Sequence, residues 1–355
     1  MRAGLRIQRW TPLSVAAMGT TALVVVLLAF GPLFLSANLI NQLTTLFIYV
    51  MLAVMWNALA GYGGLVSIGQ QAFFGLGAYA AIRVASMGVN PYLALVLGAI
   101  LVGVVSLPIS TFMLRLRAGE FAIGMWVLAE LAHLLVTLDP IVNGETGTSL
   151  LQLTRYPAPL RRTLTYWAAL VAVVVLLGTV FVLLRSRIGA AIQAIRDDEE
   201  AAASVGVKVR QTKRIIFVLA ALAAATAGAL WVAATISFQP KAYFSVQWTA
   251  YMIFMVLVGG IGTWEGAIIG AVIFFLMESW FGASGVWYLV GLGAAALVFA
   301  LFLPKGIWGM IEQRFGLSIL PVGYRVVQGR TGASAQPPGT DRNPPPASEE
   351  TRTRT

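Results

Sequence analysis

Long apolar runs follow one another along nearly the whole chain, each close to the ~20 residues that a helix needs to cross a bilayer. Short polar or charged segments separate these runs, so the pattern predicts an all-α, polytopic transmembrane helical bundle. The count is about ten spans, with a range of eight to ten because the breaks at 60–62 and 259–266 are short. The predicted spans are about 13–35, 39–60, 62–82, 90–114, 121–138, 166–184, 215–236, 249–259, 267–283 and 285–303.

A glycine-rich segment from Gly61 to Tyr79 interrupts this apolar pattern at membrane depth. Its polar side chains, those of Ser67, Gln70 and Gln71, need hydrogen-bond partners because hydrocarbon offers none. Two interpretations of these three residues stay open. Either they line a translocation path and solvate a zwitterionic cargo, or they hydrogen-bond neighbouring helices and hold the fold.

Glycine gathers a second time between Gly259 and Gly266. Because glycine lets backbones approach closely and turn freely, we interpret the glycines of both segments as helix-packing and hinge positions. Glycine-interrupted segments in the two halves of a chain are also typical of transporters with a site at the membrane midplane. The positions are Gly61, Gly64, Gly69, Gly75, Gly77, Gly259, Gly260, Gly262 and Gly266.

The composition excludes several classes of catalytic and metal-binding site. Of 355 residues, 59% are hydrophobic and only 11% are charged, whereas soluble domains have roughly a quarter charged. Cysteine is absent and His133 is the only histidine, which rules out disulfides, thiolate catalysis and metal sites built from cysteines or several histidines. No catalytic triad, phosphate-binding loop or redox motif is recognisable. We therefore expect no enzyme activity, no cofactor and no metal, but the movement of a cargo with energy supplied elsewhere.

The net charge of +10 would suggest nucleic acid as the partner of a soluble protein. Here the basic residues cluster in the segments between apolar runs. With the N-terminus inside, 19 of the 24 lysines and arginines lie on the inner side. The positive-inside rule thus predicts that both termini are cytoplasmic, and it accounts for the charge without a nucleic-acid partner.

We divide the chain into a cytoplasmic N-terminus at 1–12, a transmembrane domain at 13–315 and a tail at 325–355. The transmembrane domain includes a charged cytoplasmic loop at 185–214. The tail is rich in proline and has almost no apolar residues, so it cannot bury enough surface to offset the entropy of ordering. We expect it to be disordered.

The loop at 185–214 predicts a helix, a turn and a second helix. Asp197 or Asp198 caps a second helix from Glu199 to Val205, and Gly206 ends it. One side is apolar and the other is charged. Such an element docks to another protein or simply lies at the membrane interface, and this pattern alone does not separate the two.

Glu130 and His133 lie three residues apart and share one face of a predicted helix. We interpret them as a local hydrogen-bonded pair rather than a proton relay, because His133 is near the outer end of its span.

Several of these segments resemble one family. Glu200-Ala201-Ala202-Ala203-Ser204-Val205-Gly206 is similar to the Glu-Ala-Ala-x-x-x-Gly loop of permeases of ATP-binding-cassette (ABC) importers. The segment Tyr62 to Tyr79 resembles the Tyr-x-Gly-x-x-Ser-x-Gly-x-x-x-Phe-x-Gly-x-Gly-Ala-Tyr motif of branched-chain amino acid permeases. Ile188 to Asp197, Gly259 to Ala271 and Leu303-Pro304-Lys305-Gly306-Ile307 extend the likeness to about residues 40–315. The likeness is to the LivM-type subunit of that family.

The resemblance implies a permease of the bacterial inner membrane that imports branched-chain amino acids. It further implies a second permease subunit, two cytoplasmic ATPase subunits and an extracytoplasmic binding protein as partners. The coupling loop would then comprise Arg196, Asp197, Glu200, Ala201, Ala202 and Gly206.

Departures from the family pattern bear on the cargo. Asn143 to Thr148 stand where a Gly-Gly-x-x-Gly-Leu loop is common, and Gln70-Gln71 replace the common His-Ala or Gln-Ala. The alternatives are a permease of the same family for urea, short amides or other amino acids. A further alternative is a stand-alone secondary transporter, which predicts ion-coupling residues in the middle of its spans.

Overall fold

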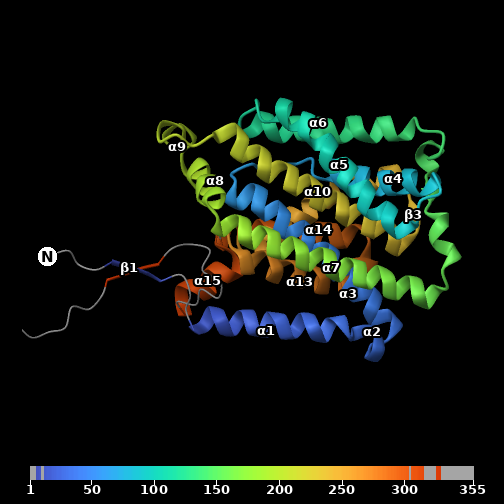
Figure 1. The fold of residues 1–355 in the computed structure, drawn as a ribbon, viewed down its shortest axis with the longest axis horizontal. Helices are drawn as coiled ribbons and strands as arrows, with labels where there is room; N and C mark the ends of the chain where they lie inside the picture. The colour runs from blue at the N-terminus through green and yellow to red at the C-terminus, as the bar shows by residue number, and fades with distance from the viewer. Residues whose placement is uncertain (1–4, 9–11, 304, 316–324, 329–355) are drawn as a thin grey trace, which may run out of the picture. The chain divides into compact units, whose positions relative to one another are not determined.

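The computed structural model describes residues 5–8, 12–303, 305–315 and 325–328 (Figure 1). Contacts divide the chain into a large helical unit within residues 10–323 and a small unit formed by the two ends of the chain. The helices are α1 (Pro12–Ala29), α2 (Gly31–Phe34), α3 (Ala37–Asn57), α4 (Gln71–Ser86), α5 (Pro91–Met113), α6 (Ala118–Thr137), α7 (Ala158–Arg185), α8 (Arg187–Asp197), α9 (Glu199–Ser204), α10 (Val209–Thr235), α11 (Pro240–Tyr243), α12 (Gln247–Gly259), α13 (Trp264–Phe281), α14 (Val286–Phe302) and α15 (Gly306–Phe315). Single turns of other helix types are η1 (Ala58–Tyr62), η2 (Gly144–Thr146), η3 (Leu151–Arg155) and η4 (Gly282–Ser284).

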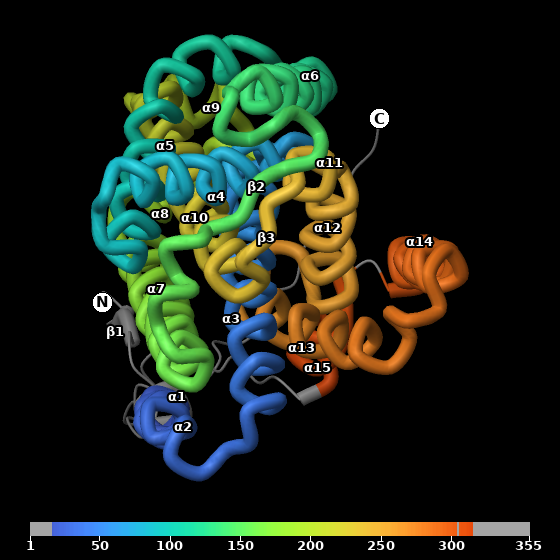
Figure 2. Tube along the Cα trace, turned by 90° about the vertical axis from the view of Figure 1, so that its right-hand side faces the viewer, coloured from blue at the N-terminus to red at the C-terminus, as the bar shows by residue number. Residues whose placement is uncertain are grey.

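Helix α3 is the centre of the large unit. Every residue from Phe47 to Tyr62 is buried, as expected for a helix that is apolar on all sides. It packs against α7, α10, α12 and α13, and the π-helical turn η1 continues it at its end. Figure 2 shows α3 between α7 and α13.

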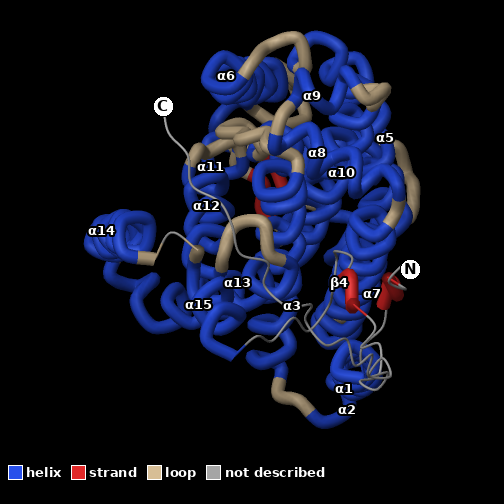
Figure 3. Tube along the Cα trace, turned by 90° about the vertical axis from the view of Figure 1, so that its left-hand side faces the viewer, coloured by secondary structure: helices blue, strands red, loops and turns tan. Residues whose placement is uncertain are grey.

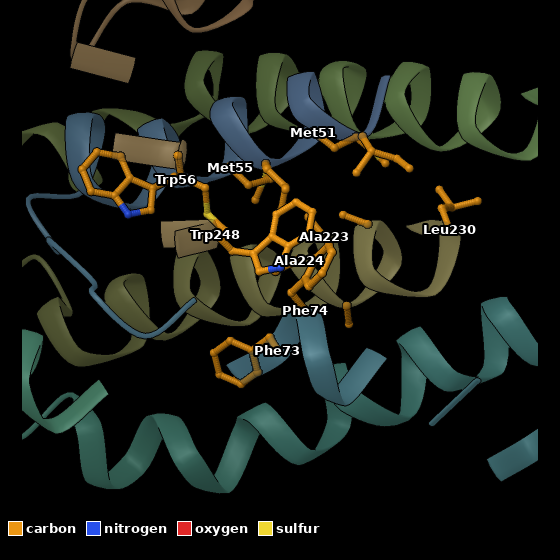
Figure 4. Packing of buried hydrophobic residues seen from close by; sticks show 14 of the residues in the cluster. Met51, Met55, Trp56, Phe73, Phe74, Ala223, Ala224, Leu230 and Trp248 are labelled. Atoms are coloured by element: carbon orange, nitrogen blue, oxygen red, sulfur yellow. The ribbon is translucent and has the colours of Figure 1, made fainter. Parts of the chain in front are cut away.

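Helices α4, α5 and α10 pack closely on one another beside α3. Small residues make this possible, because hydrocarbon gives helices no hydrophobic reason to associate and close van der Waals packing must hold them. Figure 4 shows Ala223 and Ala224 of α10 among Met55 of α3, Phe74 of α4 and Trp248 of α12. The rings of Phe74 and Trp248 lie 4.2 Å apart between centroids.

Eight described helical segments are long and apolar enough to cross a membrane, which agrees with the predicted polytopic bundle. The predicted spans 13–35 and 62–82 fall on two shorter helices, α1 and α4, so a total of about ten stays consistent. Large apolar side chains are exposed on many of these helices, where hydrocarbon would cover them. The eight segments are Ala37–Tyr62, Pro91–Met113, Ala118–Thr137, Ala158–Arg185, Val209–Thr235, Pro240–Gly259, Trp264–Ser284 and Val286–Arg314.

The predicted span 62–82 is helical only in its second part. The chain leaves the π-helical turn at Tyr62, runs irregularly from 63 to 70, and becomes helical again only at Gln71. The left-handed backbone of Gly64, with φ +67°, is one reason, because helical residues cannot adopt it. Apolar content alone showed that this segment is buried and did not show that its backbone is broken.

The helix pair α8–α9 agrees with the helix, turn and helix predicted for the loop at 185–214. The Ser186 hydroxyl caps α8 by accepting from the amides of Ile188 and Gly189. Gly206 follows α9 with φ +88°. Because α7 ends and α10 begins beside this pair, we call this end of the bundle the α8 end. Figure 3 views the molecule from that side.

At the opposite end, which we call the α11 end, a two-residue ladder joins two connections of the large unit. Strand β2 (Thr148–Ser149) pairs antiparallel with β3 (Ser237–Phe238). The ladder ties the segment between α6 and α7 to the segment between α10 and α11. Helix α7 begins at Ala158, before the predicted span 166–184, because Pro157 and Pro159 favour a helix start.

The small unit contains one described feature, a ladder between β1 (Leu5–Gln8) and β4 (Arg325–Gln328). The predicted disordered tail begins at residue 325, so its first four residues form β4. The rest of that tail, 329–355, lies outside the described residues.

Candidate functional site

The two glycine-rich segments meet at the end of α3, through the side chain of Asn57. The Asn57 amide nitrogen donates to the carbonyl oxygen of Thr263 at 2.8 Å, and its oxygen accepts from the backbone N–H of Gly262 at 2.8 Å. Asn57 is 2% exposed, so both halves of a buried amide are satisfied across about 200 residues of chain.

The backbones of Gly61 and Gly262 touch at this point. A Cβ added to Gly61 would lie 2.6 Å from the nitrogen of Gly262 and 2.2 Å from the side-chain oxygen of Asn57. Gly262 has φ +74°, which larger residues rarely adopt. Both positions therefore require glycine, one for space and the other for backbone conformation.

Arg196 of α8 joins the same point from outside the bundle. Its Nη1 donates to the carbonyl oxygen of Gly61 at 3.0 Å, and its stem lies against Gly64. Its Nε and Nη2 donate to Asp197 at 3.0 and 2.9 Å. One side chain thus connects the α8–α9 pair to the first glycine-rich segment, at the point where Asn57 joins that segment to the second. We call Asn57, Gly61, Arg196 and Gly262 the junction.

Of the other residues in the predicted coupling loop, Asp197 pairs with Arg196, and Glu200, Ala201, Ala202 and Gly206 lie on or just after α9. The Asp198 carboxylate caps α9 by accepting from the amides of Glu200 and Ala201 at 3.0 and 2.9 Å. The side chain of Glu200 is exposed, whereas Ala202 is buried. Of the two aspartates considered as the cap, the structure selects Asp198, and Asp197 pairs with Arg196. The pair presents a charged, exposed face at the α8 end.

The three polar residues predicted as path candidates have different surroundings. Ser67 is fully buried, and its hydroxyl accepts from the amide of Gly69 at 3.3 Å. The Gln71 side-chain oxygen accepts from the Thr249 hydroxyl. Gln70 is 2% exposed, and neither its amide nitrogen nor its oxygen has a hydrogen-bond partner among the described residues. Gln70 is thus the one whose polar groups remain free for a ligand or a water.

Other glycines of the two segments lie where helices cross. A Cβ at Gly69 would meet the Met125 carbonyl of α6, and one at Gly77 would meet the Ala225 carbonyl of α10 at 2.1 Å. The ring of Phe244 packs directly on Gly75, where a Cβ would collide with it. In the second segment, a Cβ at Gly259 would meet the Gly266 carbonyl, one at Gly266 the Thr263 hydroxyl, and one at Gly260, with φ +133°, the Lys305 carbonyl.

Glu130 and His133 are neighbours on α6, as predicted, but a third group joins them. Nδ1 of His133 lies 3.3 Å from Glu130, and Nε2 lies 2.9 Å from Glu145, which follows α6. The imidazole ring stacks on Phe244 at 5.7 Å. The group ties α6 to the α11 end of the molecule.

Sequence reasoning missed Asn57 and Thr249. Both lie within predicted spans, and a polar side chain at membrane depth needs a partner. That signal was present for each residue. Their partners, Gly262 and Gln71, lie too far along the chain to be inferred from spacing.

A family model and two curated relatives match most of this chain in sequence. Residues 38–303 match the family described as "Branched-chain amino acid transport system / permease component". The high-affinity branched-chain amino acid transport system permease protein LivM of Escherichia coli (strain K12) is 25% identical over 323 residues, covering 83% of this chain and 76% of its own length. The LivM protein of Salmonella typhimurium (strain LT2) gives the same figures. Among solved structures, the inward-facing conformation of a putative metal-chelate type ABC transporter is 15% identical with a TM-score of 0.48, covering 81% of this chain and 99% of that chain.

Proposed function

Because this chain belongs to the family of branched-chain amino acid transport permease components, we propose that it is the membrane-spanning subunit of an importer that carries branched-chain, hydrophobic amino acids into the cytoplasm. Two ATPase subunits dock on α8–α9 and supply the energy. A second permease subunit completes the path, and an extracytoplasmic binding protein delivers the cargo. The protein resides in the bacterial inner membrane with the α8 end in the cytoplasm.

The observation that carries this proposal is the hydrogen bond from Arg196 to the Gly61 carbonyl. A partner that moves α8–α9 would pull on the point where the central helix α3 ends. The two non-helical segments next to this point, 63–70 and 260–263, can change conformation without unwinding a whole span. A stand-alone transporter would have no need for a surface helix pair bonded to its core in this way.

The positive-inside pattern supports the orientation. Arg185, Arg187, Arg196, Lys208, Arg210, Lys213 and Arg214 all belong to the connection that contains α8 and α9. The proposed cargo agrees with the names of the two relatives, both described as permease proteins of branched-chain amino acid transport systems.

Arg196→Gln tests the proposal in vesicles that contain the chain with its partner permease, its ATPases and the binding protein. We expect ATP hydrolysis to continue while leucine uptake falls at least about tenfold, the effect of losing one charge-assisted hydrogen bond of about 1.5–3 kcal/mol. Arg187→Gln is the matched control, because Arg187 is an exposed residue of the same helix. Normal uptake in Arg196→Gln would contradict the role of the junction, and uptake without ATP would contradict an importer driven by ATPases.

A further inference from the structure

A cavity of about 250 Å³ with both polar and apolar lining residues opens at the α11 end, between the beginnings of α3 and α7 and the end of α10. Figure 2 looks onto this end of the three helices. Pockets for drug-sized ligands measure about 300–1,000 Å³, so this one fits a smaller molecule. It lies at the opposite end of α3 from the junction. The lining residues that matter here are Asn41, Thr45, Arg161, Arg162, Trp231 and Ala234.

Two guanidinium groups give the cavity a positive charge that nothing in it balances. Arg161 and Arg162 both line it, and no lining residue is acidic. Within the described residues, neither arginine has a carboxylate within 4.0 Å or a side-chain hydrogen bond. Arginine presents a planar fork of donors that matches a carboxylate or a phosphate group. The cavity is therefore prepared for an anion.

The position of these arginines on their helix points the same way. They lie near the start of α7, where the helix dipole repels cations and attracts anions. No acidic residue occupies the first turn of α7, and Pro157 provides no side-chain cap. Two cations at this place do not stabilise the helix. A bound anion would interact favourably with the guanidinium groups and with the dipole at once.

Other residues that line the cavity suit the rest of a small amino acid. Trp231, Ala233 and Ala234 form an apolar side. Asn41 and Thr45 make no side-chain hydrogen bond among the described residues, so their polar groups are free. The indole of Trp231 is held in place by Tyr49, whose ring stacks on it at 6.1 Å. An aromatic side chain that lines the same cavity as two cations discriminates an apolar amino acid from a plain anion.

We propose that this cavity receives an incoming amino acid, with its α-carboxylate on Arg161 and Arg162 and its apolar side chain against Trp231. This inference rests on the proposed function, since it assumes that the cargo is an amino acid with an apolar side chain. The site would be the first place on the chain that the cargo occupies, before it reaches the glycine-rich segments deeper in the bundle.

The test is equilibrium binding of labelled leucine to the chain, assembled with its partner subunits, in phosphatidylcholine nanodiscs. Leucinamide keeps the ammonium group and the side chain but lacks the carboxylate. We expect it to compete at least about tenfold less well than leucine for the unchanged protein. The double variant Arg161→Gln/Arg162→Gln should bind leucine about ten- to hundredfold more weakly and lose the preference over leucinamide.

Two further variants separate binding from folding. Arg155→Gln removes a nearby arginine that does not line the cavity and should bind leucine normally. Arg161→Lys/Arg162→Lys keeps both charges and should restore part of the affinity. Equal leucine binding by the double glutamine variant and the unchanged protein would overturn the proposal. So would lost binding that lysine fails to restore at all.

Two other occupants of the cavity are outcomes of the same experiment. If phosphatidylglycerol in the nanodiscs abolishes leucine binding by the unchanged protein, the arginines bind lipid phosphate and the inference fails. If the double glutamine variant loses only capture of the binding protein, the arginines form a protein contact and the inference also fails. Uptake of a short amide instead of leucine by the unchanged complex would overturn the proposed cargo. If the complex takes up leucine and the double glutamine variant binds leucine as the unchanged protein does, only the proposed role of the cavity is overturned.

Discussion

At the scale of single residues, Asn57 shows how one side chain can hold together segments that the sequence separates widely. It is the only amide side chain in the apolar stretch from Leu46 to Ala60, and it satisfies one backbone donor and one backbone acceptor of the loop between α12 and α13. These backbone groups have no helix of their own to bond. The amide therefore serves the loop as a helix cap serves a helix end.

Replacing Asn57 by leucine should strand Gly262 N–H and the Thr263 carbonyl in a buried site. Each stranded group costs about 1–3 kcal/mol, so we expect the free energy of unfolding to fall by about 2 kcal/mol or more. Thermal unfolding in detergent measures this. Thr226→Val is the control, because the Thr226 hydroxyl bonds only to Leu222 of its own helix. A loss no larger than that of the control would show that the junction bonds contribute nothing.

Asp139, just after α6, gives a residue-scale prediction about pH. The Tyr79 hydroxyl donates to its carboxylate at 2.5 Å, and the Ile141 amide donates at 3.0 Å. These bonds, with a smaller contribution from Arg83, hold the pKa of Asp139 below its ordinary value of 3.8. A lowered carboxyl pKa adds stability above the unfolded pKa, and this stability is lost as the pH falls through the folded pKa.

We therefore expect the unchanged protein to lose more stability below about pH 4 than Asp139→Asn does. Tyr79→Phe should fall between the two, because the pKa of Asp139 then moves back toward 3.8. The melting temperature measured as a function of pH decides the matter. If the melting temperatures of the three proteins change in parallel with pH, Asp139 does not contribute to the pH dependence of stability.

At the scale of elements, glycine decides how closely α4 and α10 cross. The backbone of α10 lies so near that a Cβ at Gly77 would be 2.1 Å from the Ala225 carbonyl oxygen. A second glycine, Gly228 of α10, makes the same approach to the Phe74 carbonyl of α4. Reciprocal glycines let two helix backbones meet without side chains between them.

Gly77→Ala should force α4 and α10 apart and destabilise the bundle by about 1–3 kcal/mol, as overpacking does. Gly178→Ala in α7 is the matched control, because a Cβ there meets nothing within 4 Å. The control should leave stability unchanged or raise it by about 0.5–1 kcal/mol through helix propensity. Thermal unfolding of both variants, with the yield of monodisperse protein, tests the contrast. Equal effects at the two positions would mean that the crossing is not tight.

At the scale of the whole molecule, α3 connects the two places where we expect function. Its first turns line the cavity at the α11 end, and its last residue forms the junction at the α8 end. Because the residues between them are buried on all sides, a displacement at one end cannot be absorbed by solvent-facing loops. This arrangement suits the coupling of a cytoplasmic event to the opposite side.

The proposed orientation can be tested directly because the chain has no cysteine. Ser204→Cys places a thiol on exposed α9, and Thr154→Cys places one in the exposed segment before α7. We expect a membrane-impermeant thiol reagent to label Thr154→Cys in intact cells and Ser204→Cys only after the membrane is opened. The reverse labelling would invert the topology and place the α8–α9 pair outside, away from any ATPase.

The sequence by itself determined the class of protein. Apolar runs of membrane length, charge asymmetry and the helix signals at Asp198 and Gly206 are local properties, because each depends on neighbouring residues. The spans, the surface helix pair and the family resemblance could therefore all be predicted. The irregular backbone of 63–70 within the predicted span 62–82 could not, since burial of apolar residues does not specify backbone conformation.

Only the tertiary structure decided which distant residues act together. The contacts between Asn57 and Gly262, between Arg196 and Gly61, and between Gln71 and Thr249 each join residues more than a hundred positions apart. The cavity at Arg161 likewise needs three helices to exist. Such contacts follow from how helices pack in three dimensions. A linear pattern of polar and apolar positions indicates that a buried polar side chain needs a hydrogen-bond partner. It does not identify the residue that is the partner.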